Sequence, residues 1–174
     1  MARPSFSDLR DLAPGPETCG EIDIRIARDG TWFYHGSPIG RKPLVKLFAS
    51  VLRRNSDGSY WLVTTAERVC IRVDDVPFVA VAVSAVGKGK QARLVFTTNV
   101  EDVITAGTQH PIRVAFDPVT AEPAPYVTVR DGLEALIARP VYYELVDRGE
   151  IRGDRFGVWS DGEFFALGEA PCAS

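Results

Sequence analysis

The pair of basic residues Arg41 and Lys42 stands directly before a predicted helix and is the clearest chemical signal in the sequence. The start of a helix leaves backbone N–H groups without partners and carries the positive end of the helix dipole. Anions bind at such ends, and basic side chains add charge of the matching sign. The pair therefore predicts a pocket for phosphate or carboxylate. The alternative is that both side chains point into water or pair with a carboxylate such as Glu67.

The helix itself is predicted over residues 43–53. Pro43 suits the first helical position, and Asn55 with the turn Asp57-Gly58 ends the helix. Its apolar residues recur at i, i+3, i+4, i+7 and i+8, so they share one face. They are Leu44, Leu47, Phe48, Val51 and Leu52.

The two histidines, His35 and His110, do not predict a metal site. Zinc requires three or four ligands in close spacing, and neither histidine has such neighbours in the sequence. His35 ends a predicted strand and is expected to cap a turn. Asp74-Asp75 precedes Pro77 and is expected to form a solvated turn.

Motifs of the common enzyme classes are absent from the sequence. Gly87-Lys88-Gly89-Lys90 lacks the glycine spacing and the Ser/Thr of a Walker loop, so it predicts a basic hairpin turn. Cys19, Cys70 and Cys172 match no zinc or disulfide framework, and we expect free thiols in a reducing cytosol. The sequence thus predicts no cofactor and gives no support to an enzyme of a common class.

The composition is that of an ordinary globular protein. The 174 residues are 45% hydrophobic and 25% charged, with a net charge of −3. Basic residues are scattered rather than gathered in a stripe, which disfavours nucleic-acid binding. No run of about 18 apolar residues predicts a membrane span, and residues 1–20 do not resemble a secretory signal. We therefore expect a cytoplasmic protein.

Asp-Gly pairs predict three β-hairpins with a common pattern. Asp-Gly between alternating runs favours a tight turn, because glycine accepts positive φ and aspartate tolerates it. The recurrence indicates either a duplicated β unit or the same turn chemistry arising independently. The three segments are residues 22–34 around Asp29-Gly30, 54–64 around Asp57-Gly58, and 156–167 around Asp161-Gly162.

Further strands and two ambiguous segments complete the pattern. The nearly continuous apolar run 78–86 predicts a central strand covered on both faces. Residues 99–106 predict one or two helical turns, because Glu101 and Asp102 suit a helix start. Residues 133–137 fit a strand or a helix start, and 140–146 have helical spacing but many β-formers. Additional strands are predicted at 60–64, 69–73, 93–97, 112–116 and 126–129.

The predicted fold class is α+β, with mostly antiparallel strands and one or two packed helices. If the hairpins reflect a repeat, a β-rich unit is duplicated. The expected organisation is a flexible lead-in at 1–19, a first α+β unit at 20–85 and a second β-rich unit at 86–174.

Several short stretches, taken in order, resemble the bacterial domain-of-unknown-function family numbered 1285. The resemblance covers about residues 20–168. One departure is visible at 65–68, where Thr65 replaces an expected proline, and of Ala66-Glu67-Arg68 only Arg68 matches the expected basic character. The stretches are Gly36-Ser37-Pro38-Ile39 with 44–52, then 62–67, 73–78, 97–99, 125–127, 132–135 and 157–162.

The resemblance implies a duplicated α+β core whose second half is similar to a pleckstrin-homology fold. It also implies a nucleotide-like ligand in a cleft between the halves and a role in signalling. On this basis the phosphate would meet Arg41, Lys42 and Lys46. A base or ribose would meet Thr64, Thr65, Glu67 and Asn99, and Tyr126 and Arg130 would close the other side.

Each of these residues also has a structural interpretation. The two threonines would end a strand, Asn99 would cap the short helix after it, and Glu67 would pair with an arginine.

Three functions are therefore carried forward. The first is a small-ligand-binding regulatory module for a nucleotide or another phosphorylated anion. The second is a protein-interaction module that needs no small ligand. The third is an unrecognised hydrolase that uses Glu67, His35 and Asp75.

Overall fold

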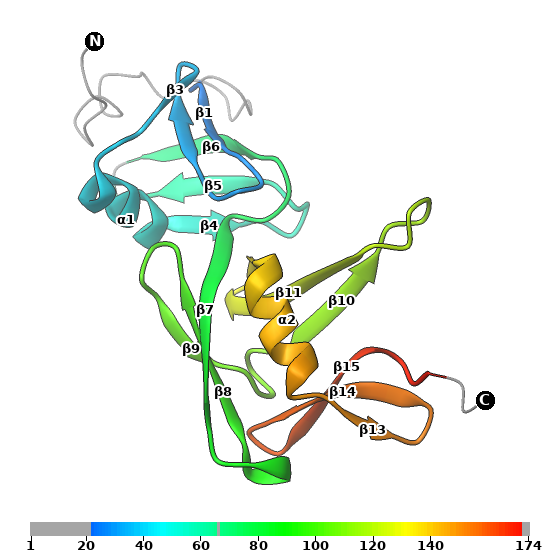
Figure 1. Ribbon diagram of the computed structural model, residues 1–174. Coiled ribbons are helices and arrows are strands. Elements are labelled where there is room, and N and C mark those ends of the chain that lie inside the picture. Colours follow the sequence, from blue (N-terminus) through cyan, green and yellow to red (C-terminus); the bar gives the residue numbers. More distant parts are fainter. Residues whose placement is uncertain (1–21, 66, 172–174) are drawn as a thin grey trace. The chain divides into compact units, whose positions relative to one another are not determined.

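The computed structural model of the chain describes residues 22–65 and 67–171 (Figure 1). The predicted lead-in at 1–19 lies outside the described residues. The chain divides into two compact units at Pro77/Phe78, earlier than the boundary at 85/86 expected from the sequence. The division falls there because the strand that begins at Phe78 pairs only with later strands.

The N-terminal unit is a six-stranded sheet with one α-helix. The strand order is β3-β2-β1-β6-β5-β4, and every pair is antiparallel except β1 with β6. The sheet is therefore two three-stranded meanders joined by one parallel pair. Its elements are β1 (Ile24–Ile26), β2 (Trp32–Tyr34), β3 (Ser37–Pro38), α1 (Lys42–Ser50), β4 (Leu52–Arg54), β5 (Tyr60–Val63) and β6 (Arg68–Val73).

The core of this unit confirms the alternation seen in the sequence. Ile24 and Ile26 are fully buried, and the ring of Trp32 stacks on Phe48 of α1 with centroids 6.0 Å apart. The predicted helix 43–53 is too long at its C-terminal end. Leu52 lies in β4, where it pairs with Leu62, because the Asp57-Gly58 hairpin sets the register back to that residue.

The C-terminal unit contains a second six-stranded sheet, a second α-helix and a three-stranded sheet. The six-stranded order is β10-β11-β12-β7-β8-β9, with β12 parallel to β7 and every other pair antiparallel. The elements of this sheet are β7 (Phe78–Val86), β8 (Arg93–Thr98), β9 (Val103–Thr105), β10 (Ile112–Phe116), β11 (Pro123–Arg130) and β12 (Leu133–Ile137).

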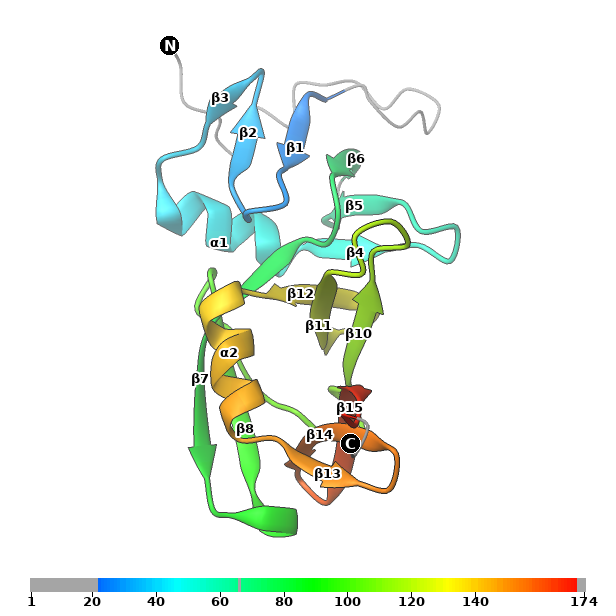
Figure 2. The same ribbon diagram turned by 45° about the vertical axis from the view of Figure 1, so that its right-hand side comes forward.

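The remaining elements of this unit adjoin that sheet. The helix α2 lies beside β7 in both views (Figures 1 and 2). The three-stranded sheet meets the β7–β8 turn, which contains a short 3₁₀ helix. The bounds are η1 (Gly89–Gln91), α2 (Arg139–Asp147), β13 (Glu150–Arg152), β14 (Arg155–Ser160) and β15 (Glu163–Glu169).

Two buried contacts fix the three-stranded sheet to the rest of the C-terminal unit. The Ser160 hydroxyl accepts a hydrogen bond from Leu94 N–H at 2.9 Å and donates one to the Ala106 carbonyl at 2.7 Å. Ser160 is fully buried, so its oxygen replaces water for both groups. Gly157 of β14 allows close approach of β15, since a Cβ there would lie 2.2 Å from the Phe165 carbonyl oxygen.

Two predictions about this unit are wrong. β7 is central in its sheet but is not covered on both faces, because Val81 and Val86 are 51% and 62% exposed. Residues 99–106 contain a turn and the strand β9 rather than helical turns. Pairing of Val103–Thr105 with β8 completes the meander, and this tertiary contact outweighs the local preference for a helix start.

The two open assignments are settled by the structure. Residues 133–137 form β12, and 140–146 lie within α2. The described chain is therefore mostly β and rich in antiparallel pairs, as predicted, with two similar six-stranded sheets. None of its helices, within the described ranges, is long and apolar enough to cross a membrane.

The expectation of free thiols is corrected at Cys70. This residue is buried in β6 and is disulfide-bonded. Cys19 and Cys172 lie outside the described residues.

Candidate anion-binding pocket

The start of α1 retains the positive charge predicted for it but offers few free amides. Arg41 and Lys42 are exposed, and the first turn holds no acidic residue. Pro43 has no N–H, and Leu44 N–H and Val45 N–H donate to the Arg41 carbonyl at 3.1 and 3.2 Å. An anion there would depend on side chains rather than on backbone donors.

The residues Thr64 and Glu67 close the turn between β5 and β6. Thr64 N–H donates to the Glu67 carbonyl at 2.8 Å, and Glu67 N–H donates to the Thr64 hydroxyl at 3.1 Å. Val63 N–H donates to the Val51 carbonyl, so this turn adjoins the C-terminal end of α1. The helix is about 13 Å long at 1.5 Å per residue, which separates Thr64, Thr65 and Glu67 from Arg41 and Lys42.

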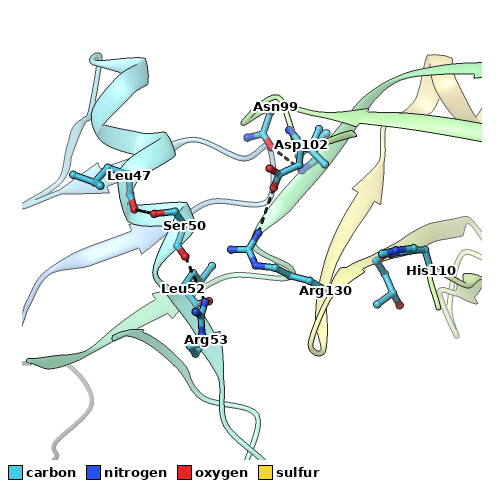
Figure 3. Close-up of polar contacts among 11 residues, drawn as sticks. Leu47, Ser50, Leu52, Arg53, Asn99, Asp102, His110 and Arg130 are labelled. Carbon is cyan, nitrogen blue, oxygen red and sulfur yellow. Dashed lines mark hydrogen bonds and ion pairs between the residues drawn. The ribbon is translucent and has the colours of Figure 1, made fainter. Parts of the chain in front are cut away.

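Asn99 ties β7 to β8 in the C-terminal unit. Its side-chain oxygen accepts from Val79 N–H at 3.0 Å, and its own N–H donates to the Val79 carbonyl at 2.8 Å. Figure 3 shows Asn99 beside Asp102 at the end of β8. The residue thus continues the β7–β8 pairing one step beyond Ala80 and Thr98 instead of capping a helix.

Arg130 is held in a local contact. Its guanidinium lies 3.4 Å from the Asp102 carboxylate (Figure 3) and above the Phe78 ring at 5.6 Å. These contacts orient the side chain, so a ligand at this position would compete with Asp102.

Tyr126 is also enclosed by neighbouring side chains. Its ring is buried, with the Arg113 guanidinium 4.2 Å from the ring centroid. Arg113 in turn makes two hydrogen bonds to Glu134, at 2.7 and 2.8 Å. The structure therefore gives Asn99, Tyr126 and Arg130 clear structural roles.

The three residues of the hydrolase hypothesis are not assembled into one site. Glu67 precedes β6 and Asp75 follows it, and a six-residue strand is about 20 Å long. Asp75 faces Arg28 at 3.7 Å, and His35 lies 4.0 Å from Asp23. No group of three His, Cys, Asp or Glu side chains in the described part of the chain is placed to hold a metal ion.

A pocket of about 220 Å³ lies within the C-terminal unit. It is formed by the β7–β8 turn, the end of α2 and the strands β13 and β14. Its walls combine apolar side chains, glycines and a small set of charges. The lining residues are Ala85, Gly87, Lys88, Gly89, Ala92, Leu94, Arg148, Glu150, Val158 and Trp159.

The pocket has two cations available to a ligand. Lys88 stands at the N-terminal end of η1, and Arg148 follows the last residue of α2. Neither side chain forms an ion pair with any residue that the structure describes. Glu150 is the one acidic residue of the lining, and its carboxylate accepts a hydrogen bond from the Trp159 indole N–H at 2.6 Å. With two cations and one carboxylate, the lining carries +1 in a chain of net charge −3.

Two further cations surround Trp159 itself. Lys90 Nζ lies 5.4 Å from the ring centroid, and the Arg152 guanidinium lies 4.9 Å from it. The edge of Phe164 meets the same indole at 5.3 Å. Such cation–π contacts are worth about 0.5–1 kcal/mol at exposed sites, so a ligand can displace them at low cost.

Glycines allow the basic turn to reach β14. Gly87 and Gly89 have φ of +80° and +60°, a region that side chains rarely adopt. A Cβ at Gly87 would also lie 3.1 Å from the Gln91 carbonyl oxygen. Asp161 N–H donates to the Ala92 carbonyl at 2.9 Å, which links the end of the turn to the end of β14.

The sequence predicted the turn but not its partners. Gly87-Lys88-Gly89-Lys90 forms the expected basic hairpin turn, yet Arg148 and Trp159 come to it from some 60 and 70 residues further along the chain. The available signal was a basic turn without a nearby acid, together with a tryptophan in a predicted hairpin.

Two family models match adjoining parts of the chain. One, described as "Domain of unknown function (DUF1285), N-terminal domain", matches residues 14–76. The other, described as "Protein of unknown function (DUF1285), C-terminal domain", matches residues 77–167. A search of curated proteins finds no match.

Two crystal structures are similar to the chain. A DUF1285 family protein from Silicibacter pomeroyi DSS-3 has 57% identity and a TM-score of 0.82, covering 85% of this chain and 80% of that one. A DUF1285 family protein from Shewanella baltica OS155 has 24% identity and a TM-score of 0.58, covering 74% and 93%, and shows the fold alone. Because the family models match most of its length, the chain belongs to the DUF1285 family.

Proposed function

We propose that the chain is a small-ligand-binding regulatory module of cytoplasmic signalling. Its C-terminal unit binds an anionic ligand, a nucleotide or another phosphorylated compound, in the pocket beside Trp159. The observation that supports this is a pair of cations, Lys88 and Arg148, that line a pocket and have no ion-pair partner among the described residues. Unpaired cations beside a cavity favour an anion more than paired ones, because no existing contact must break.

The size of the pocket sets the scale of the ligand. At about 30 Å³ per water, 220 Å³ corresponds to roughly seven waters. That space suits one flat ring system, with the rest of the ligand and its anionic group at the rim near the exposed Lys88 and Arg148. A hydrogen bond to a charged group contributes about 1.5–3 kcal/mol, and the exposed rim favours the lower end.

Regulation would follow from the three elements that the pocket joins. A ligand that contacts the β7–β8 turn, the end of α2 and β14 holds them together and stabilises the unit. Such binding can change how the unit meets a partner protein. The likeness to a pleckstrin-homology fold that the family resemblance implies for this half is part of the same proposal.

The test measures anion binding by the full-length protein. Inorganic phosphate, pyrophosphate and ribose 5-phosphate are titrated by calorimetry and by thermal shift. We expect the double variant K88A/R148A to lose at least tenfold in affinity, while R41A/K42A, which removes two cations from the start of α1, binds as the wild type does. The proposal fails if none of the three anions binds, or if R41A/K42A and not K88A/R148A abolishes binding.

A second function is favoured by a separate surface of the C-terminal unit. A groove of about 670 Å³ lies between β10 and β15, which are both end strands of their sheets. Phe116 lines it and is 53% exposed, and Val119 in the adjoining hairpin tip is 90% exposed. Exposed apolar residues beside open strand edges suit a protein partner. A lysate pull-down that recovers a stoichiometric protein with the wild type but not with F116S/V119S would support it, and recovery of none would exclude it.

A further inference from the structure

We infer that the ligand of the Trp159 pocket carries, beside its anionic group, a flat nitrogen-bearing ring that donates N–H groups to Glu150. This inference rests on the proposed function and names the class of compound that the same pocket selects. The ring packs against Trp159, and its donor edge faces the carboxylate.

Glu150 is the residue that selects the ring. A carboxylate only accepts hydrogen bonds, and it has about four acceptor positions. One of them receives the Trp159 indole N–H at 2.6 Å, which fixes the side chain and leaves the others for a ligand. Because it is negative, this carboxylate repels the phosphate and therefore faces a different, N–H-donating part of the ligand.

The wall next to Glu150 suits a flat apolar surface. Leu94 and Val158 are nearly fully buried and line the pocket with the half-buried Trp159. Aromatic side chains bind the faces of nucleobases and similar rings with little dependence on sequence. Once Lys90 or Arg152 is displaced from its face, the indole accepts any flat ring, and the choice among rings falls to Glu150.

Glu150 and Trp159 are well placed to act together. Glu150 begins β13 and pairs with Gly157 of β14, two residues before Trp159. Residues two apart on a strand point to the same face, so the register brings the carboxylate and the indole to one side of the sheet. The short hydrogen bond between them is a direct consequence of this register.

The class that fits best is a guanine-type nucleoside monophosphate. A ring with two adjacent N–H donors on one edge can make two parallel hydrogen bonds to one carboxylate, as arginine does. Hypoxanthine presents only one of those donors, and adenine presents a donor beside an acceptor. The phosphate would then pair with Lys88 and Arg148, the cations that line the same pocket.

The experiment compares GMP, IMP, AMP and ribose 5-phosphate on the full-length wild type, E150Q, W159F and W159A. We expect the wild type to bind GMP at least tenfold more tightly than IMP or AMP. E150Q should remove this preference and leave ribose 5-phosphate affinity unchanged or slightly raised. W159F, which keeps a ring but lacks the indole N–H that fixes Glu150, should retain nucleotide binding with a smaller preference for GMP. W159A should lower nucleotide affinity toward that of ribose 5-phosphate.

Two results would overturn the inference. Equal affinity of the wild type for GMP, IMP and AMP would show that the ring is not selected, and an unchanged preference in E150Q would show that Glu150 does not select it. Failure of the proposed function is distinct, because in that case ribose 5-phosphate affinity does not respond to K88A/R148A. Near-ultraviolet circular dichroism of each variant confirms that the fold is retained.

Discussion

The two units share one strand plan and differ in what is added to it. In each, two three-stranded meanders join through a parallel pair, formed by the first strand of one meander and the last strand of the other. The N-terminal unit inserts α1 between its meanders, whereas the C-terminal unit adds α2 and a three-stranded sheet after them. The Trp159 pocket combines the β7–β8 turn of the shared plan with α2, β13 and β14, so the candidate function requires the added elements.

The two units also differ in whether their basic residues are paired with acids. In the N-terminal sheet, basic residues beside the parallel pair have acidic partners, with Arg25 on Asp74 at 3.1 Å and Arg72 on Asp23 at 2.6 Å. In the C-terminal pocket, Lys88 and Arg148 have no such partner among the described residues. Exposed ion pairs contribute little stability, but they neutralise a surface, and Lys88 and Arg148 leave the pocket lining positive.

The Asp-Gly turns have one geometry in the N-terminal unit and another in the C-terminal unit, so they do not trace a repeat. Asp29 and Asp57 accept the N–H of the residue two positions on, and only the glycine after each has positive φ. At Asp131 and Asp161 both the aspartate and the following glycine have positive φ, the geometry of a two-residue type I′ turn. Strand order therefore indicates the duplication, and the recurring Asp-Gly pair reflects turn chemistry.

The largest expected effect is a loss of stability in the N-terminal unit that leaves the pocket intact. Phe48 is fully buried against Trp32, so F48A should lower the free energy of unfolding of this unit by about 3–5 kcal/mol. Urea denaturation measures the loss of unfolding free energy. Calorimetry without urea, at a temperature where the variant is folded, should find its phosphate affinity unchanged. L47A is the control, because Leu47 is 45% exposed. An equal loss in both variants would contradict this account of the core.

The second effect breaks the attachment of the added sheet. S160A leaves Leu94 N–H and the Ala106 carbonyl without their buried partner, which should cost about 2–4 kcal/mol of unfolding free energy. Thermal and urea unfolding measure it, with S84A on the exposed part of β7 as the matched control. If S160A is as stable as S84A, the three-stranded sheet is held by other contacts.

The third effect tests the close approach of β14 and β15. G157A places a methyl group against the Phe165 backbone, which cannot move as a side chain would, and should cost about 1–3 kcal/mol or more. Gly168 in β15 has open space at its Cβ position, so G168A should be near neutral. Comparable melting temperatures for the two variants would show that the strands are further apart than described.

The smallest effect concerns acid stability of the N-terminal turns. Hydrogen bonds from the Ser59 hydroxyl and backbone hold the pKa of Asp57 below its ordinary value of 3.8, and the Thr31 backbone N–H does the same for Asp29. A carboxyl with a lowered folded-state pKa stabilises above its unfolded pKa, and this contribution is lost as pH falls through the folded value. Melting temperature should therefore fall below about pH 4, and less steeply in D29N/D57N. Parallel curves for variant and wild type would rule out this contribution.

The sequence predicted features that depend on near neighbours in the chain. Asp-Gly hairpins, the buried alternation of Ile22, Ile24 and Ile26, and the start of α1 all follow from local propensity and period. It did not predict the end of α1 at Ser50 or the strand β9, because strand pairing decides both. Strand pairing between distant segments is not visible in a single sequence.

The candidate site was less predictable than the fold for the same reason. The sequence indicated that residues 87–90 form a basic turn, but the residues that turn it into a pocket are distant in the chain. Arg148 follows α2, and Glu150 and Trp159 meet through the register of β13 and β14. The structure also shows contacts of Asn99 and Tyr126 that the sequence did not reveal, a hydrogen bond from Val79 N–H to Asn99 and packing of Arg113 on Tyr126.

The most direct test of the account follows backbone amide and indole N–H resonances of the ¹⁵N-labelled full-length chain during titration with ribose 5-phosphate and then GMP. The account predicts that the largest shifts occur at residues 87–91, Arg148 and the Trp159 indole, and that Trp32 and Trp61 do not respond. Shifts concentrated at residues 41–46, with Trp159 unchanged, would contradict it and place the anion at the start of α1.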